Sequence, residues 1–229
     1  MKTEIDVIYE DNHLLVLNKP ALLPTMGVKP DQPSLINLAK AYLKQKYAKP
    51  GNVYLGVVSR LDSFVSGVVV FARTSKSAAR LTKQFSNGET SKLYYAIVPS
   101  FQCKSQDDLI HWLAKDESNH RMMTVSKDTT KAKRAHLKYE CMGECRNHCL
   151  LRIELLTGRK HQIRVQLATT NRAIVGDRKY GSKEPFQSGI ALHSYSLSIQ
   201  HPTRKESLTF ERNPPQWWRV ERFLNSTNS

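Results

Sequence analysis

Residues 68–72 form a continuously apolar run, VVVFA, which constrains the fold more than any other segment. Successive side chains of a β-strand point to opposite faces of the sheet, so an unbroken apolar run predicts a strand that is covered on both faces. Residues 135–141 differ, because apolar and polar side chains alternate there as in a half-buried strand. We therefore expect a sheet that is covered on both faces in one part and on one face in another.

Strand patterns and helix patterns are interspersed along the chain. Residues 150–156 pair naturally with 135–141, and further strands are predicted at residues 7–9, 14–17, 93–98, 190–199 and 207–210. Helices are predicted from Ser34, over 75–88 with Ser75 as the cap, and over 161–170. The first predicted helix has one apolar face, formed by Leu35, Leu38, Ala39, Tyr42 and Leu43. Strands and helices do not alternate as regular βαβ units, so the pattern favours an α+β fold.

No linker, repeat or low-complexity segment divides the 229 residues. We therefore predict one domain over residues 1–224 and a disordered tail over 225–229. Trp217 and Trp218 are expected to dock the C-terminal segment onto the core.

The charge balance points to a polyanionic partner. Lys and Arg number 35 against 20 Asp and Glu, which gives a formal net charge of +15, and such a field attracts nucleic acid. No apolar run approaches the roughly 20 residues that a membrane span needs, and the polar N-terminus does not look secretory. We expect a cytoplasmic protein with reduced cysteines.

Cys141, Cys145 and Cys149, with His148 between them, are residue types that bind zinc. Structural zinc sites usually pair cysteines two to four residues apart in two separated knuckles, whereas these residues surround a turn-like segment at 143–147. We therefore predict a β-hairpin here and no metal.

Three segments hold residues suited to chemistry. Asp62 stands on a polar loop just before the apolar run, and Arg60 can keep it ionised as a nucleophile or base, although an exposed ion pair is the alternative. Residues 156–164 place a glycine and several cations at the start of a helix, which suits phosphate or a solvated basic face. Tyr94 and Tyr95 point to opposite faces of a strand, so one can line a cleft.

The order and spacing of these segments resemble the RluA-type RNA pseudouridine synthases. The matching segments are IYED at 8–11, LVLNKP at 15–20, RLD at 60–62, SG at 66–67, KLY at 92–94, LTGRKHQIRV at 156–165, IVGD at 174–177, YG at 180–181 and LH at 192–193. The resemblance implies a mixed, mainly antiparallel β-sheet flanked by helices and loops, with an active-site cleft across the sheet.

The resemblance also implies an isomerase that converts a specific uridine of ribosomal or transfer RNA to pseudouridine, without a metal or organic cofactor. Asp62 corresponds to the catalytic aspartate, Tyr94 to the active-site tyrosine, and Arg164 to the arginine that pairs with the aspartate. Arg60 corresponds to a residue that fills the space left by the extruded base. The expected RNA-binding residues are Arg60, Lys19, Arg159, Lys160, His161 and Lys92. We expect RNA as the partner, no membrane association, and a monomer.

The chain departs from the family pattern at two positions. Ser59 stands where the family commonly has His, and Val65 where it has Thr before the Ser-Gly pair. We expect activity to persist but loop geometry and RNA target to differ. The pattern begins near residue 5, so we also expect no N-terminal S4-like module.

Two other functions compete with this interpretation. A non-catalytic RNA-binding protein on the same fold is the main alternative, but a carboxylate such as Asp62 would repel the phosphate backbone. A hydrolase of glycosidic bonds is the second, and it would need another carboxylate, for which Asp177 is the candidate.

Overall fold

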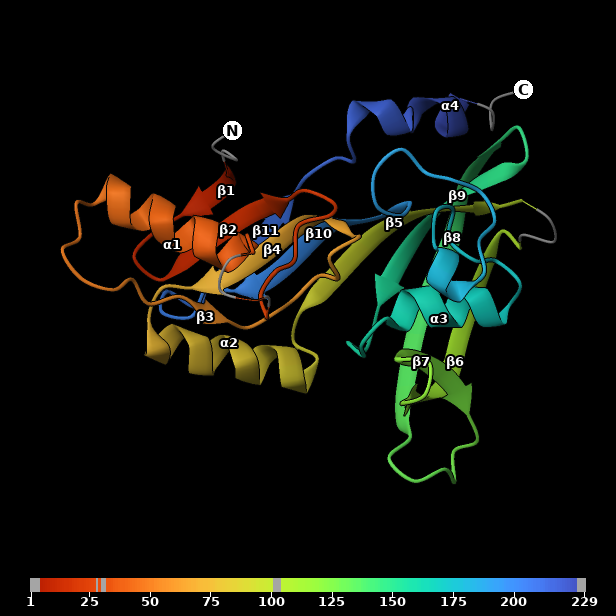
Figure 1. Cartoon of the computed structure of the whole chain (residues 1–229), viewed down its shortest axis with the longest axis horizontal. Coiled ribbons are helices and arrows are strands. Elements are labelled where there is room, and N and C mark those ends of the chain that lie inside the picture. Colours follow the sequence, from red (N-terminus) through yellow and green to blue (C-terminus); the bar gives the residue numbers. More distant parts are fainter. Residues whose placement is uncertain (1–4, 28, 30–31, 101–103, 226–229) are drawn as a thin grey trace. The chain divides into compact units, whose positions relative to one another are not determined.

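The computed structural model describes residues 5–27, 29, 32–100 and 104–225, so Cys103 and positions 226–229 of the predicted tail lie outside the described residues. The chain forms two compact units, each built from two segments (Figure 1). Unit 1 comprises Met1–Ser91 and Ser194–Asn213, and unit 2 comprises Lys92–His193 and Pro214–Ser229.

Unit 1 contains a sheet whose strands follow the order β1-β2-β4-β10, with β3 paired to β4 and β11 paired to β10. The strands are β1 (Asp6–Glu10), β2 (Leu14–Lys19), β3 (Gly56–Val57), β4 (Ser66–Ala72), β10 (Leu192–Gln200) and β11 (Ser207–Glu211), and the first two residues of β10, Leu192 and His193, belong to unit 2. The β1–β2, β2–β4, β3–β4 and β10–β11 pairs are antiparallel. Two helices, α1 (Leu35–Lys46) and α2 (Ser75–Asn87), complete the unit.

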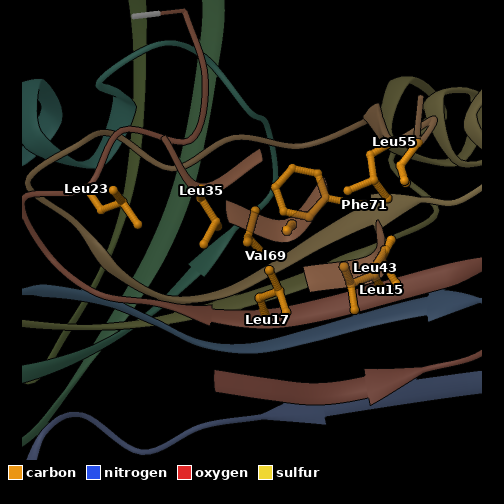
Figure 2. Close-up of a cluster of buried hydrophobic side chains, with 10 residues drawn as sticks. Leu15, Leu17, Leu23, Leu35, Leu43, Leu55, Val69 and Phe71 are labelled. Carbon is orange, nitrogen blue, oxygen red and sulfur yellow. The ribbon is translucent and has the colours of Figure 1, made fainter. Parts of the chain in front are cut away.

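The central strand β4 is buried along its whole length, as the apolar run predicts. Val69 and Phe71 point to one face and pack with Leu15 of β2 and with Leu35 and Leu43 of α1 (Figure 2). The alternate residues of β4 point to the other face and pack around Leu81 of α2; this second cluster contains Leu14, Val16, Val68, Val70, Ala72, Leu197, Ile199 and Phe210. The sheet of unit 1 is therefore covered on both faces.

The helix boundaries follow the sequence with one correction. Ser34 is the N-cap of α1 and Gly88 the left-handed C-cap of α2, as predicted. The N-cap of α2 is Thr74 rather than Ser75, because Thr74 has extended backbone angles and its hydroxyl accepts a hydrogen bond from Ser77 N at 3.1 Å. Ser75 is the first residue inside the helix.

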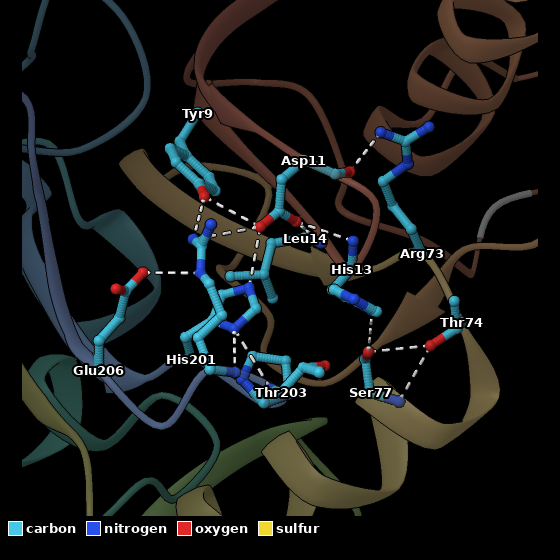
Figure 3. Close-up of polar contacts among 12 residues, drawn as sticks. Tyr9, Asp11, His13, Leu14, Arg73, Thr74, Ser77, His201, Thr203 and Glu206 are labelled. Atoms are coloured by element: carbon cyan, nitrogen blue, oxygen red, sulfur yellow. Dashed lines mark hydrogen bonds and ion pairs between the residues drawn. The ribbon is translucent and has the colours of Figure 1, made fainter.

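A polar network joins the β1–β2 turn to the β10–β11 turn within unit 1 (Figure 3). Asp11 Oδ1 accepts hydrogen bonds from the amides of His13 and Leu14, both at 2.8 Å. Asp11 Oδ2 is 2.9 Å from Tyr9 Oη and 2.8 Å from His201 Nε2. One carboxylate thus organises two turns that are far apart in the sequence.

Unit 2 contains an antiparallel sheet of order β5-β9-β8-β6-β7. The strands are β5 (Ser91–Pro99), β6 (Gln106–Asp116), β7 (Arg121–Val125), β8 (Lys133–Cys145) and β9 (His148–Leu155). The helices are α3 (Gln162–Thr169) and α4 (Glu221–Leu224), with short 3-10 turns η1 (Arg178–Tyr180) and η2 (Gln216–Trp218). Val165 of α3 packs on Leu113 and Ala135.

The β8–β9 hairpin confirms the predicted pairing of residues 135–141 with 150–156. The strands continue farther than predicted, because Cys145 pairs with His148 and only Arg146 and Asn147 form the turn. Arg146 adopts a left-handed φ of 57°, as a tight hairpin turn requires. The strands β6 and β7 were not predicted from the sequence.

Trp218 docks the C-terminal segment within unit 2, as expected. Its side chain is 5% exposed and its ring packs edge-on against Phe186 and His193. Among the described residues, no helix is both long and apolar enough to cross a membrane. The architecture is α+β with a mainly antiparallel sheet, as predicted.

Candidate active site

Asp62 lies half-buried on the loop that precedes β4 in unit 1. Its backbone carbonyl accepts a hydrogen bond from Val65 N at 3.1 Å, which closes a turn. Leu61 is fixed by Thr25, whose hydroxyl donates to Leu61 O at 2.8 Å and accepts from Leu61 N at 3.2 Å. Because Thr25 is only 3% exposed, the backbone on both sides of Asp62 is held from inside the unit.

Lys19 holds the same loop with its ammonium group. Nζ donates hydrogen bonds to the carbonyl oxygens of Pro20, Leu23 and Ser63 at 2.9, 2.8 and 3.2 Å. Burial lowers the pKa of Lys19 to about 7, against the opposing effect of the negative charge of Asp62. Lys19 is 0% exposed, so this position supports the loop from inside and does not fit the predicted RNA contact.

Gly67 lets β4 approach β10 directly after the loop. Its φ is +113°, and a Cβ atom at this position would lie 2.2 Å from Ser194 O. Both the backbone angle and the close approach exclude any other residue without rearrangement. This requirement gives a physical reason for the Ser66-Gly67 pair.

The outer side of the loop is accessible. Arg60 is exposed and Phe64 is 46% exposed, whereas Val65 is 3% exposed. A guanidinium and an aromatic ring therefore flank Asp62 in sequence and face solvent in unit 1. Both groups suit contact with unstacked nucleic-acid bases.

Arg164 lies in the first turn of α3 in unit 2 and is 3% exposed. Nε and Nη2 donate to the two carboxylate oxygens of Asp177 at 2.7 and 2.8 Å. The guanidinium carbon is 5.0 Å from the ring centroid of Tyr180. Tyr180 Oη accepts from Met122 N at 3.0 Å and can donate to His161 Nδ1 at 2.8 Å. The orientation of Arg164 is therefore fixed by its neighbours in unit 2.

Asp177 is 1% exposed and uses both carboxylate oxygens to accept hydrogen bonds from Arg164. A carboxylate that accepts hydrogen bonds from one guanidinium at both oxygens serves as the charge partner of that buried guanidinium. The hydrolytic alternative, which required Asp177 as a second catalytic carboxylate, gains no support from this arrangement.

Gln162 organises the basic turn before α3. Its Oε1 accepts from the Thr157 hydroxyl at 2.8 Å and from Arg159 N at 2.9 Å, and its Nε2 donates to His136 O at 3.1 Å. Arg159 and the neighbouring Lys160 are exposed. The turn thus presents two cations to solvent on a hydrogen-bonded backbone, an arrangement that suits contact with phosphate.

Lys92 and Tyr94 lie on β5. Burial lowers the pKa of Lys92, and the positive charge of Arg159 adds to this effect. Tyr94 is 9% exposed and pairs with Ile153 of β9. Tyr95, its neighbour on the strand, is half-buried.

The structure groups the predicted site residues by unit. Unit 1 contains Asp62, Arg60 and Lys19, and unit 2 contains Tyr94, Arg164, Lys92, Arg159, Lys160 and His161. The sequence did not identify Thr25 and Gln162 as supports of the two turns. The only signal in the sequence for such a supporting residue was a polar side chain beside a motif. The hydrogen-bond partner of that side chain is set by the fold.

Comparison with known proteins decides the family. A family model described as RNA pseudouridylate synthase matches residues 13–169, which is more than half of the chain. The chain belongs to the RNA pseudouridylate synthase family. It is similar to the dual-specificity RNA pseudouridine synthase RluA of Haemophilus influenzae, with 30% identity over 90% of this chain and 91% of that protein. Membership in the family makes the chain an RNA-modifying isomerase.

Other family members give the same result. Ribosomal large subunit pseudouridine synthase D of Zymomonas mobilis is 30% identical over 93% of this chain and 70% of that protein. The solved structure of human RNA pseudouridylate synthase domain containing 4 superposes with a TM-score of 0.78 and 21% identity, covering 96% of this chain and 93% of that chain. The pseudouridine synthase fold predicted from the sequence is confirmed.

Proposed function

We propose that this RNA pseudouridine synthase isomerises specific uridines in ribosomal or transfer RNA and that Asp62 is its catalytic carboxylate. The name of one relative, a ribosomal large subunit enzyme, supports ribosomal RNA as a substrate, and another relative is described as dual-specificity. The family's reaction exchanges the N1–C1′ bond of uridine for a C5–C1′ bond. The proton lost from C5 is balanced by one gained at N1, so no co-reactant is needed.

The main support for a catalytic role of Asp62 is that the backbone of its loop is held in place by hydrogen bonds. Thr25 and Lys19 both hold the backbone next to Asp62 from inside unit 1, while Asp62 as a residue is only half-buried. A fixed backbone around a half-buried aspartate provides the positioning that attack at C1′, or proton removal from the sugar, requires.

Tyr94 and Arg164 are proposed as the other active-site residues. A tyrosine can stack on uracil and transfer a proton, and a guanidinium held rigidly by Asp177 and Tyr180 gives a fixed positive charge. Arg60, Arg159 and Lys160 are proposed to contact RNA because their side chains are exposed.

The test is release of tritium from RNA that carries the label at uracil C5, because isomerisation must remove that hydrogen. Wild type is compared with Asp62→Asn, which keeps the size of the side chain but removes its charge. The matched control is Asp128→Asn, because Asp128 is an exposed carboxylate in the β7–β8 loop of unit 2.

We expect Asp62→Asn to reduce the rate by about 10⁴-fold or more, as expected for loss of a covalent or basic catalyst, and Asp128→Asn to be as active as wild type. Retained activity in Asp62→Asn would refute its catalytic role. If wild type binds RNA tightly but releases no label from either ribosomal or transfer RNA, the non-catalytic alternative is favoured.

A further inference from the structure

The β8–β9 hairpin of unit 2 gathers two thiols and a carboxylate at one place. The side-chain ligand atoms of Cys141, Glu144 and Cys149 all lie within 4.8 Å of one another. Cys149 is buried, Cys141 is half-buried and Glu144 is exposed. The cluster therefore extends from the interior of the unit to its surface, which gives a small ion a route of entry.

A β-bulge produces this grouping. Cys141 pairs with Leu151 and Glu144 pairs with Cys149, while the register shifts between Cys141 and Gly143. Leu151 and Cys149 are two residues apart on β9 and share a face, so their partners on β8 share that face as well. Without the extra residue, positions 141 and 144 would point to opposite faces.

The bulge itself depends on Gly143. Its φ is +156°, and a Cβ atom there would lie 2.0 Å from Phe223 O of α4. The packing of α4 against the hairpin therefore keeps a glycine at this position and the bulge in place. The cluster is thus fixed by the fold and does not depend on a mobile loop.

The donor set suits a thiophilic divalent cation. Zinc binds thiolate at about 2.3 Å and carboxylate oxygen at about 2.0–2.2 Å, so the sulfurs of a tetrahedral site are roughly 3.8 Å apart. Since the ligand atoms lie within 4.8 Å of one another, their separations need to shorten by at most about 1 Å to reach that geometry. Gly143 O, which already accepts a hydrogen bond from the Cys141 thiol at 3.7 Å, or a water molecule can supply the fourth ligand.

We propose that Cys141, Glu144 and Cys149 form a three-ligand site for Zn²⁺ or a similar thiophilic cation at the β8–β9 bulge. Binding converts two thiols to thiolates and releases two protons, with no change of oxidation state. The sequence expectation of no metal rested on the lack of paired knuckles. The bulge provides a different arrangement, with ligands from two paired strands.

Cys145 offers a matched control on the same strand. It pairs with His148 at the end of the hairpin, next to Glu144, so its side chain points to the opposite face. It is a free cysteine of the same hairpin and takes no part in the proposed site.

The experiment titrates the chelator-treated, reduced full chain with Co²⁺ and then with Zn²⁺. We expect thiolate-to-cobalt charge-transfer absorption that saturates at one ion per chain and is abolished by Zn²⁺. Cys141→Ser is expected to weaken Co²⁺ binding about tenfold or more, with Cys149→Ser as a second variant. Cys145→Ser should bind as wild type does.

Circular dichroism of each variant establishes that the fold is retained, and the half-buried position of Cys141 makes its substitution the safer one. The proposal is overturned if wild type shows no thiolate-to-cobalt absorption. Equal weakening by Cys145→Ser and Cys141→Ser would also overturn it, and so would unchanged affinity in Glu144→Gln.

Discussion

The buried ammonium group of Lys19 holds the loop around Asp62 in place. Its ammonium has three N–H donors, and three carbonyl oxygens from two loop segments accept them. A neutral amine has only two N–H groups, so deprotonation leaves one carbonyl without its donor and removes the positive charge near Asp62. The local pKa of about 7 places this change in the neutral range.

We predict that Lys19→Met lowers kcat by about 100-fold, because the Ser63 carbonyl beside Asp62 loses its donor and the loop is no longer positioned. In wild type, kcat should fall as the pH rises through about 7, and this fall should be missing in the variant. Single-turnover tritium release measured against pH tests both statements. A wild-type rate that is constant across this range would contradict the role of Lys19.

Stability should change with pH in the opposite sense. The pKa of Lys19 falls from 10.5 to about 7 on folding, so the unfolded chain binds more protons between these values. The free energy of unfolding of wild type should therefore rise relative to Lys19→Met as the pH increases through this window. Urea titrations at several pH values separate this effect from the loss of rate.

Gly67→Ala should destabilise unit 1 by about 2–4 kcal/mol, since it combines a positive φ with a clash against Ser194 O. The control is Gly88→Ala, at a positive φ of +73° with nothing within 4 Å of the added Cβ. It should cost only about 1 kcal/mol. Equal losses in urea titrations would show that the close approach of β4 to β10 is unimportant.

The sequence motifs supplied the candidate catalytic residues but not the residues that hold their backbone in place. Asp62, Arg164 and Tyr94 stand in recognisable motifs. Thr25 supports Leu61, which lies 36 residues away, and a contact of this kind is created by the fold. Lys19 was placed in a motif, yet its burial and its carbonyl partners follow from the path of the loop.

At the scale of helices and strands, an element is predicted correctly from the sequence when its apolar residues follow a clear period. The apolar run of β4 and the alternation of β8 each have one clear interpretation, and both were confirmed. The strands β6 and β7 lie at one side of the sheet of unit 2 and are only partly buried, with two buried residues in β6 and none in β7, so their hydrophobic period is weak. Their pairing with each other and with β8 defines them instead.

The Asp11 network provides a prediction at this scale (Figure 3). Burial raises the pKa of Asp11, but hydrogen bonds from the amides of His13 and Leu14 and from Tyr9 and His201 outweigh it and lower the pKa from 3.8 to about 2. Because the pKa in the folded state is lowered, the stabilisation is present above about pH 4 and is lost as the pH falls towards 2.

Asp11→Asn should therefore reduce the free energy of unfolding by about 1 kcal/mol near neutral pH, after allowance for solvent screening. The difference from wild type should shrink as the pH is lowered to about 3. Urea titrations of both proteins measure it, and Asp128→Asn serves again as the exposed control. A difference that does not depend on pH would show that the charge of Asp11 is not what stabilises the turns.

For the whole molecule, composition predicts an excess of positive charge, and the positions of individual residues show where that charge can act. The net charge of +15 favours RNA in general, but only cations placed against phosphates should change the salt dependence of binding. Arg159 and Lys160 are exposed on a turn whose backbone is fixed by Gln162. They are therefore the strongest candidates for phosphate contacts in unit 2.

We predict that the double variant Arg159→Gln/Lys160→Gln reduces the slope of log K against log salt concentration by about 1.4, since each contact with single-stranded RNA contributes about 0.7. The control is Lys44→Gln/Lys83→Gln, which removes two exposed cations from α1 and α2. Both variants lower the net charge equally, so a general field would make their slopes fall together. A lower slope in the Arg159/Lys160 variant alone would show that position, rather than net charge, determines how this synthase binds its RNA.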